Sequence, residues 1–175
     1  VASGTIRSTL EFVNADLYER DHLQHIADPL QRSEAAREWA DRRRAELLDA
    51  KIEFVSETVF SHPSKLSLIG HSQALGYQVV LYVVSVDDPK RLLVRVSQRV
   101  AEGGHHVPPD RILQRYPRTM ANLKTAVRLA DLTFVFDAVE SEQGAHRLVA
   151  LCELEQTTMV ADNPPIWVTA MLAKS

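Results

Sequence analysis

The stretch RVSQRVAEGGHHVPPDRILQRYPR, residues 95–118, concentrates positive charge in a chain whose net charge is -3. From Arg91 to Arg118, six arginines are balanced only by Glu102 and Asp110, which gives a local charge of +4 and leaves -7 for the rest of the chain. The arginines recur at helical spacing on both sides of a Gly-Gly-His-His-Val-Pro-Pro segment. The sequence therefore predicts two helices with cationic faces, joined by a hinge.

The cationic faces have two interpretations. Facing each other, they repel unless the protein's own carboxylates pair with them or a polyanion such as a triphosphate lies between them. The alternative is a solvated helix surface with scattered salt bridges. We favour a lid over a phosphate, around residues 95–118, because the glycine pair supplies the hinge that such a lid needs. The arginines concerned are Arg91, Arg95 and Arg99 before the hinge and Arg111, Arg115 and Arg118 after it.

Length and composition predict one globular domain, residues 1–175, with 45% hydrophobic and 25% charged residues. The longest apolar run, 79–84, is too short to cross a bilayer, and no signal peptide is evident. A lone cysteine, Cys152, in an apolar run predicts a packed core thiol and a reducing compartment. We therefore expect a cytoplasmic protein with no membrane partner, and a pI near 6.2 argues against general nucleic-acid binding.

Hydrophobic periodicity predicts strands that alternate with helices. Such alternation is typical of an α/β three-layer sandwich with a mainly parallel sheet, here with a small C-terminal β-hairpin. The run 78–86 has the composition of a strand buried on both faces, and Pro117 predicts a break in its helix. The expected strands are 10–15, 52–55, 78–86, 132–137 and the hairpin 144–154 with 157–160; the expected helices are 33–50, 64–75, 89–101, 109–129 and 167–173.

Polar residues follow two of the expected strands, where ligands gather in parallel sheets. Asp16, in FVNAD, can accept a proton from a hydroxyl or help to hold magnesium, or it can simply cap a turn. Glu57, Thr58 and Ser61, in SETVFSHPSK, can hydrogen-bond a polyhydroxylated substrate, although Ser61 can also cap the following helix. The adjacent His105 and His106 have no further ligand at a suitable spacing, so we expect no zinc site.

The segments FVNAD, SETVFSHPSK, RVSQRVAEGGHHVPPDRILQRYPR and ADLTFVFD, in this order, resemble the zeta-toxin-like family of P-loop kinases. The resemblance runs from about residue 12 to residue 137, and GGHHVP between RVxxRV and RxLxRY is its most specific part. It implies a P-loop NTPase fold of the nucleoside-kinase type. It also implies ATP and Mg2+ as cofactors, a small hydroxyl-bearing substrate, and an antitoxin as a possible protein partner. In the best-known branch of the family the substrate is UDP-N-acetylglucosamine.

The resemblance also implies roles for single residues. Asp16 resembles the catalytic base, and Glu57 with Thr58 resembles the substrate-binding pair, to which we add Ser61. Arg95, Arg99 and Arg115 resemble the cations that compensate the charge of the transferred phosphate, Arg95 and Arg99 in a catalytic role. The residues expected to bind the nucleotide are Gly4, Ser8, Thr9, His105, Arg115 and Arg118. Phosphoryl transfer depends on positioning and charge compensation, which a lid of arginines over a rigid sheet can supply.

The N-terminus departs from the family pattern. A P-loop kinase needs GxxxxGK[ST] between a strand and a helix, whereas VASGTIRSTL lacks the second glycine and the lysine. Either the nucleotide site has degenerated, or residues of the phosphate loop are missing from this sequence. We favour the second explanation, since phosphate loops are often mobile and the chain begins at Val1 without Met. It requires some neighbouring Cα atoms among residues 2–9 to lie well beyond the trans spacing of about 3.8 Å.

Three functions are therefore open. The first is an ATP-dependent small-molecule kinase, for which the resemblance allows the role of toxin in a toxin–antitoxin pair. The second is a nucleotide-binding pseudokinase or interaction module without turnover. The third is an RNA-binding module, which we rank last because aromatic residues make up only 6% of the chain and Tyr116 alone is placed to stack on a base.

Overall fold

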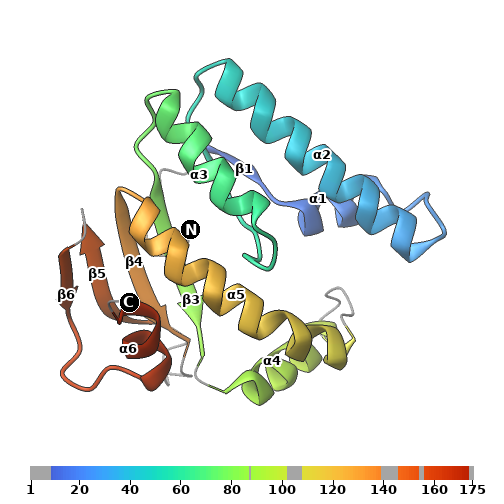
Figure 1. Cartoon of the computed structure of the whole chain (residues 1–175). Coiled ribbons are helices and arrows are strands. Elements are labelled where there is room, and N and C mark those ends of the chain that lie inside the picture. Colours follow the sequence, from blue (N-terminus) through green and yellow to red (C-terminus); the bar gives the residue numbers. More distant parts are fainter. Residues whose placement is uncertain (1–8, 87, 102–107, 139–145, 154–155, 174–175) are drawn as a thin grey trace. The chain divides into compact units, whose positions relative to one another are not determined.

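The computed structural model describes residues 9–86, 88–101, 108–138, 146–153 and 156–173. The chain divides into two compact units, Val1–Thr58 and Val59–Ser175, and most of their elements are labelled in Figure 1. None of the helices in the described part is long and apolar enough to cross a membrane. The mixed α/β class expected from the sequence is confirmed in both units.

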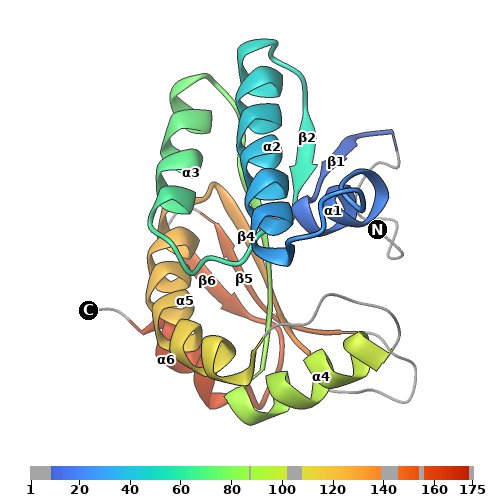
Figure 2. The same cartoon turned by 90° about the vertical axis from the view of Figure 1, so that its right-hand side faces the viewer.

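The first unit contains two short parallel strands and two helices. Val13 lies opposite Ser56 in the pair, and Figure 2 shows the two strands side by side. A parallel pairing needs a long crossover, which the two helices supply. In chain order the elements are β1 (Glu11–Val13), α1 (Ala15–His22), α2 (Pro29–Asp49) and β2 (Phe54–Ser56).

Helix α2 supplies most of the core of the first unit. Ala40 and Leu47 pack with Val13, and all three side chains are almost fully buried. Trp39 lies beside them and stacks on Tyr18 of α1, with ring centroids 3.8 Å apart. These contacts fix α1 and β1 against α2, so the end of β1 is held in place by packing on its helix.

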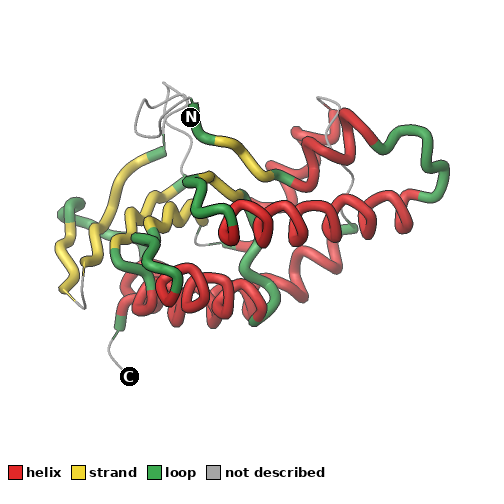
Figure 3. Tube along the Cα trace, turned by 90° about the horizontal axis from the view of Figure 1, so that it is seen from above, coloured by secondary structure: helices red, strands yellow, loops and turns green. Residues whose placement is uncertain are grey.

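The second unit contains a four-stranded sheet and four helices, and Figure 3 shows its strands gathered side by side. The strand order is β3-β4-β5-β6. Helix α5 packs with α3, α4 and α6. Its Leu123 and Val127 join Val135, Trp167 and the buried Cys152 in the core, which confirms the predicted core thiol. The elements are α3 (Ser64–Ala74), β3 (Val80–Ser85), α4 (Pro89–Ala101), α5 (Pro109–Leu129), β4 (Leu132–Asp137), β5 (Arg147–Glu153), β6 (Gln156–Met159) and α6 (Ile166–Leu172).

The expectation of a mainly parallel sheet is wrong for these four strands. Only β3 and β4 are parallel, whereas β4 with β5 and β5 with β6 are antiparallel. Helices α4 and α5 provide the crossover between β3 and β4. The connections after β4 and β5 are short, and a short connection can join only antiparallel neighbours. The predicted C-terminal hairpin is confirmed as β5 and β6.

Two further expectations about single elements are also wrong. Strand β3 is not buried on both faces, since Val80 is 40% and Val84 46% exposed; β3 lies at an edge of the four-stranded sheet, where fewer neighbours cover it. Pro117 does not break its helix, because α5 runs continuously through it. Proline removes one helical hydrogen bond, and at this exposed position water can satisfy the freed carbonyl.

Candidate functional site

Asn14 begins the candidate site directly after β1. It is 9% exposed and forms the N-cap of α1, with its Oδ1 accepting a hydrogen bond from the backbone N–H of Leu17 at 3.0 Å. Its Nδ2 donates to Oε2 of Glu57 at 2.7 Å. A single buried amide therefore both starts the helix and holds the carboxylate that follows β2.

Glu57 reaches Asn14 because β1 and β2 are parallel and end together. Beyond the Val13–Ser56 pair, the backbone N–H of Glu57 donates to the carbonyl of Val13 at 3.3 Å. Asp16 lies in the first turn of α1, two residues after Asn14, and is exposed. The structure thus places Asp16 and Glu57 at the carboxyl ends of neighbouring strands, as the sequence predicted. Thr58 follows and is half-buried.

Asp16 does not have the capping role that its alternative interpretation gave it, since Asn14 is the N-cap. Asp16 is the acidic residue in the first turn of α1, the helix end at which negative charge is favoured, and its side chain is open to solvent. An exposed carboxylate at this position can accept a proton from a bound alcohol.

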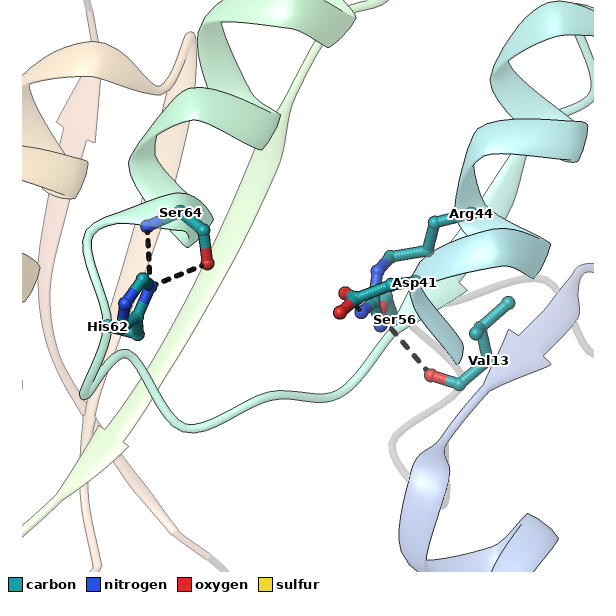
Figure 4. A network of polar contacts seen from close by, with 6 residues as sticks. All are labelled: Val13, Asp41, Arg44, Ser56, His62 and Ser64. Atoms are coloured by element: carbon teal, nitrogen blue, oxygen red, sulfur yellow. Dashed lines mark hydrogen bonds and ion pairs between the residues drawn. The ribbon is translucent and has the colours of Figure 1, made fainter. Parts of the chain in front are cut away.

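A buried arginine of α2 lies next to the last residues of the two strands, Val13 and Ser56 (Figure 4). Arg44 of α2 is 4% exposed; its Nη1 donates to Oγ of Ser56 at 3.1 Å, and its Nη2 donates to Asp41. Oγ of Ser56 in turn donates to the carbonyl of Val13 at 3.3 Å. Arg44 is therefore connected to the end of each strand.

Ser61 belongs to the second unit and is half-buried. Its alternative role as the cap of α3 is wrong. The N-cap position of α3 is Pro63, which has no side-chain cap, and before it Nδ1 of His62 accepts a hydrogen bond from the backbone N–H of Ser64 at 3.2 Å and lies 3.0 Å from Oγ of Ser64 (Figure 4). Ser61 thus remains a candidate for substrate binding only.

The two cationic helices form as the sequence predicted. Helices α4 and α5 pack against each other, with residues 102–107 between them outside the described part. On α5, Arg111, Arg115 and Arg118 are exposed, and within the described residues none of them forms an ion pair. These three guanidinium groups are therefore available to an external anion. Exposed arginines without ion pairs are expected for a phosphate-binding surface. They are also expected for a solvated helix surface, so both interpretations stay open.

Several predicted site residues cannot be placed. The loop residues Gly4 and Ser8, with the proposed break in the chain before residue 9, lie outside the described residues, as does His105. Arg95 and Arg99 lie on α4, but their side chains are also outside the described part. Thr9 lies in an exposed turn before β1. Their expected roles stay predictions.

The comparisons with known proteins give one match. A family model described as zeta toxin matches residues 23–148, more than two thirds of the chain. The chain belongs to the zeta toxin family. No curated protein and no solved structure matches it. The zeta toxin match covers Glu57, Thr58 and all six arginines of residues 91–118. It begins after Asn14 and Asp16, so the proposed catalytic base, Asp16, is supported only by its position after β1 and not by the family match.

Membership of the zeta toxin family indicates a P-loop kinase-like function and hence nucleotide use. The described residues suit such a ligand in part: exposed guanidinium groups on α5 match a polyphosphate, and Asp16 can contribute one carboxylate to a magnesium ion, which usually takes only one or two from the protein. Among the described residues, no three or more His, Cys, Asp or Glu side chains lie together as a metal-binding group.

Two residues of this site were missed from the sequence. Asn14 lies inside the expected strand 10–15, but Asn directly after an apolar run is a typical N-cap, a signal that ends the strand earlier and also predicts the unexpected helix α1. Arg44 falls at four-residue spacing with Ala40 and Leu48 on the buried side of α2. A charged residue on an apolar stripe indicates a buried polar network, so this signal too was present in the sequence.

Proposed function

We propose that this protein is an ATP-dependent kinase that transfers a phosphoryl group to a hydroxyl of a small molecule. The proposal assigns it a single P-loop kinase domain with a three-layer arrangement, an arginine lid around 95–118 and a cytoplasmic location. Family membership supports the kinase class. The observation that carries the site is the 2.7 Å contact between Asn14 and Glu57, which ties the carboxylate after β2 to the N-cap of the helix that carries Asp16.

In this proposal each residue has one task. Asp16 accepts the proton of the attacking hydroxyl. Glu57, oriented by Asn14, and Thr58 bind the polar groups of the acceptor. Magnesium-bound ATP supplies the phosphoryl group, and Arg95, Arg99 and Arg115 compensate its negative charge. A nucleotide sugar is the first acceptor to test, and an antitoxin is the protein partner that the family suggests.

The deciding experiment incubates the protein with labelled ATP, Mg2+ and fractionated metabolite pools, followed by mass spectrometry of every product that gains a phosphate. We expect a labelled product that Asp16→Asn reduces by about 100-fold or more, since general-base catalysis contributes about that factor. Arg99→Ala should also reduce it sharply. Asp21→Asn is the matched control, because Asp21 lies on the same helix and pairs only with its exposed neighbour Arg20 among the described residues.

A second candidate function is a nucleotide-binding pseudokinase or interaction module. It is favoured by one observation, the absence of GxxxxGK[ST] from residues 1–10. Such a protein binds ATP or a protein partner without turnover and tolerates Asp16→Asn. If no pool yields a labelled product but the protein still binds ATP, the kinase function is rejected in favour of this module.

A further inference from the structure

The guanidinium group of Arg44 has no task in the proposed reaction, yet it is buried. Its side chain is 5% exposed, whereas its acidic partner Asp41 is 55% exposed. Removing a guanidinium from water is costly unless its N–H groups find acceptors. If the only role of Arg44 were an ion pair with Asp41, a position at the surface would serve as well. Its second acceptor, Oγ of Ser56, therefore needs an explanation.

The Arg44–Ser56 bond has a fixed direction. Arginine carries donors only, so Oγ of Ser56 must accept from Nη1 of Arg44, and its single proton is then directed to the carbonyl of Val13 at 3.3 Å. The same carbonyl accepts the backbone N–H of Glu57. Two donors from the end of β2 thus converge on the last residue of β1, and Arg44 fixes the orientation of one of them.

We propose that Arg44 is a positioning residue that acts through Ser56 on the ends of β1 and β2. The carbonyl of Val13 leads directly into Asn14, and Asn14 holds the carboxylate of Glu57. Fixing that carbonyl fixes the amide of Asn14, the orientation of Glu57 and the start of the helix that carries Asp16. The expected effect on catalysis rests on the proposed kinase function, whereas the effect on the Asn14–Glu57 contact does not.

The first test is the NMR position of the Asn14 side-chain amide in 15N-labelled protein. Glu57→Ala removes the acceptor and defines the position of the released amide. We expect Ser56→Ala and Arg44→Lys to move the signal toward that position, and Ser56→Thr, which keeps the hydroxyl, to leave it near the wild-type position. Circular dichroism checks that each variant is folded.

Arg43→Ala is the matched control. Arg43 directly precedes Arg44 on α2. It binds Glu11 at the start of β1, the end of the strand away from the site, through hydrogen bonds of 2.6 and 2.8 Å. Its removal weakens the attachment of α2 to β1 without touching the strand ends, so the Asn14 signal should not move. A signal that moves as far in Arg43→Ala as in Ser56→Ala would reduce Arg44 to a structural anchor and overturn the proposal.

The second test is turnover, measured in the same variants with the acceptor from the metabolite screen. We expect Ser56→Ala to lower kcat by about tenfold or more, since a misplacement of about 1 Å can cost about 100-fold, while Ser56→Thr and Arg43→Ala stay within about twofold of wild type. If the wild type has no turnover but Ser56→Ala still moves the Asn14 signal, the kinase function fails and the positioning role stands. An unchanged Asn14 signal in both Ser56→Ala and Arg44→Lys overturns the positioning role, as does failure of Ser56→Ala to fold.

Discussion

The ion pair between Glu11 and Arg43 makes stability depend on pH in a defined direction. The hydrogen bonds from Arg43 lower the pKa of Glu11 below its ordinary 4.5, against a smaller opposing effect of burial. A carboxyl group with a lowered folded-state pKa stabilises the fold above its unfolded-state pKa and loses that contribution as the pH falls through the folded-state value. We expect Glu11→Gln to destabilise the protein at pH 7 and to become neutral well below pH 4.5.

The measurement is the difference in free energy of unfolding between wild type and Glu11→Gln, from urea titrations between pH 3 and pH 7. The expected difference is small, because the Glu11 side chain is 38% exposed and solvent screens the pair. Glu53→Gln is the control, since Glu53 is exposed and has no ion pair among the described residues. A difference that grows as the pH falls would contradict the assignment.

Cys152 should be chemically inert in the folded protein. Burial raises the pKa of its thiol, and the hydrogen bond from Oγ1 of Thr157, at 3.7 Å, opposes this only weakly. Because the thiolate is the reactive form, a buried thiol with a raised pKa reacts slowly. We expect a thiol reagent at pH 8 to label Cys152 slowly in buffer and rapidly in urea. Equal rates in the two conditions would show that the strand β5 opens freely.

At the scale of elements, helix α3 ends in a Schellman motif that depends on Gly76. Its φ is +89°, the N–H of Gly76 donates to the carbonyl of Gln73 at 2.9 Å, and the N–H of Tyr77 donates to that of Ser72 at 3.0 Å. No atom lies within 4 Å of an added Cβ, so the cost of Gly76→Ala is backbone strain alone. We expect a loss of about 1 kcal/mol in unfolding free energy, and less for Gly76→Asn.

Gly70 provides the matched control in the same helix. It lies inside α3, and an added Cβ again meets no atom within 4 Å. Gly70→Ala should therefore stabilise the protein by about 0.5–1 kcal/mol, the helix propensity difference. Urea unfolding of the two variants checks both signs. If Gly76→Ala also stabilises, the positive φ does not limit this helix end.

The helices whose ends were predictable from the sequence have a glycine or a proline at those ends. Helix α3 was expected to end before Gly76, and α4 and α5 to begin at Pro89 and Pro109, as the structure has them. Helix α1 was not predicted, since its eight residues carry too little apolar periodicity and only its cap, Asn14, marks it. The start of α2 was placed too late because Asp28 and Pro29, a cap and a first-turn proline, precede its apolar stripe.

At the scale of the whole molecule, the sequence predicted that Asp16 and Glu57 follow neighbouring strands, but it did not predict the hydrogen bond that orients Glu57. Asp16 and Glu57 were predictable because residues that follow parallel strands meet at one edge. The link between Asn14 and Glu57 joins residues 43 positions apart, and only the pairing of β1 with β2 brings them together. The pattern of residues along one segment does not specify which residue of another strand it pairs with. The contact between Asn14 and Glu57 could therefore be seen only in the folded structure.

The charge distribution leads to a prediction about ligand binding by the whole chain. A net charge of -3 disfavours anion binding in general, so an affinity for a polyphosphate must come from the local cations of residues 91–118. Arg115 is exposed on α5 and has no ion pair within the described residues. We expect Arg115→Gln to weaken ATP binding about tenfold, as measured by calorimetry, and to flatten the dependence of the dissociation constant on salt, because one fewer charge contacts the phosphates.

Arg128→Gln distinguishes a local contact from the overall charge. Arg128 lies on the same helix and is also exposed, but its Nη2 donates to the carbonyl of Ala173 at 2.9 Å. Both substitutions change the net charge by the same amount. If long-range attraction alone drew ATP to the protein, the two variants would lose affinity equally and show the same salt dependence. A tenfold loss confined to Arg115→Gln instead requires direct contact between this face of α5 and the phosphates, as a closing arginine lid demands.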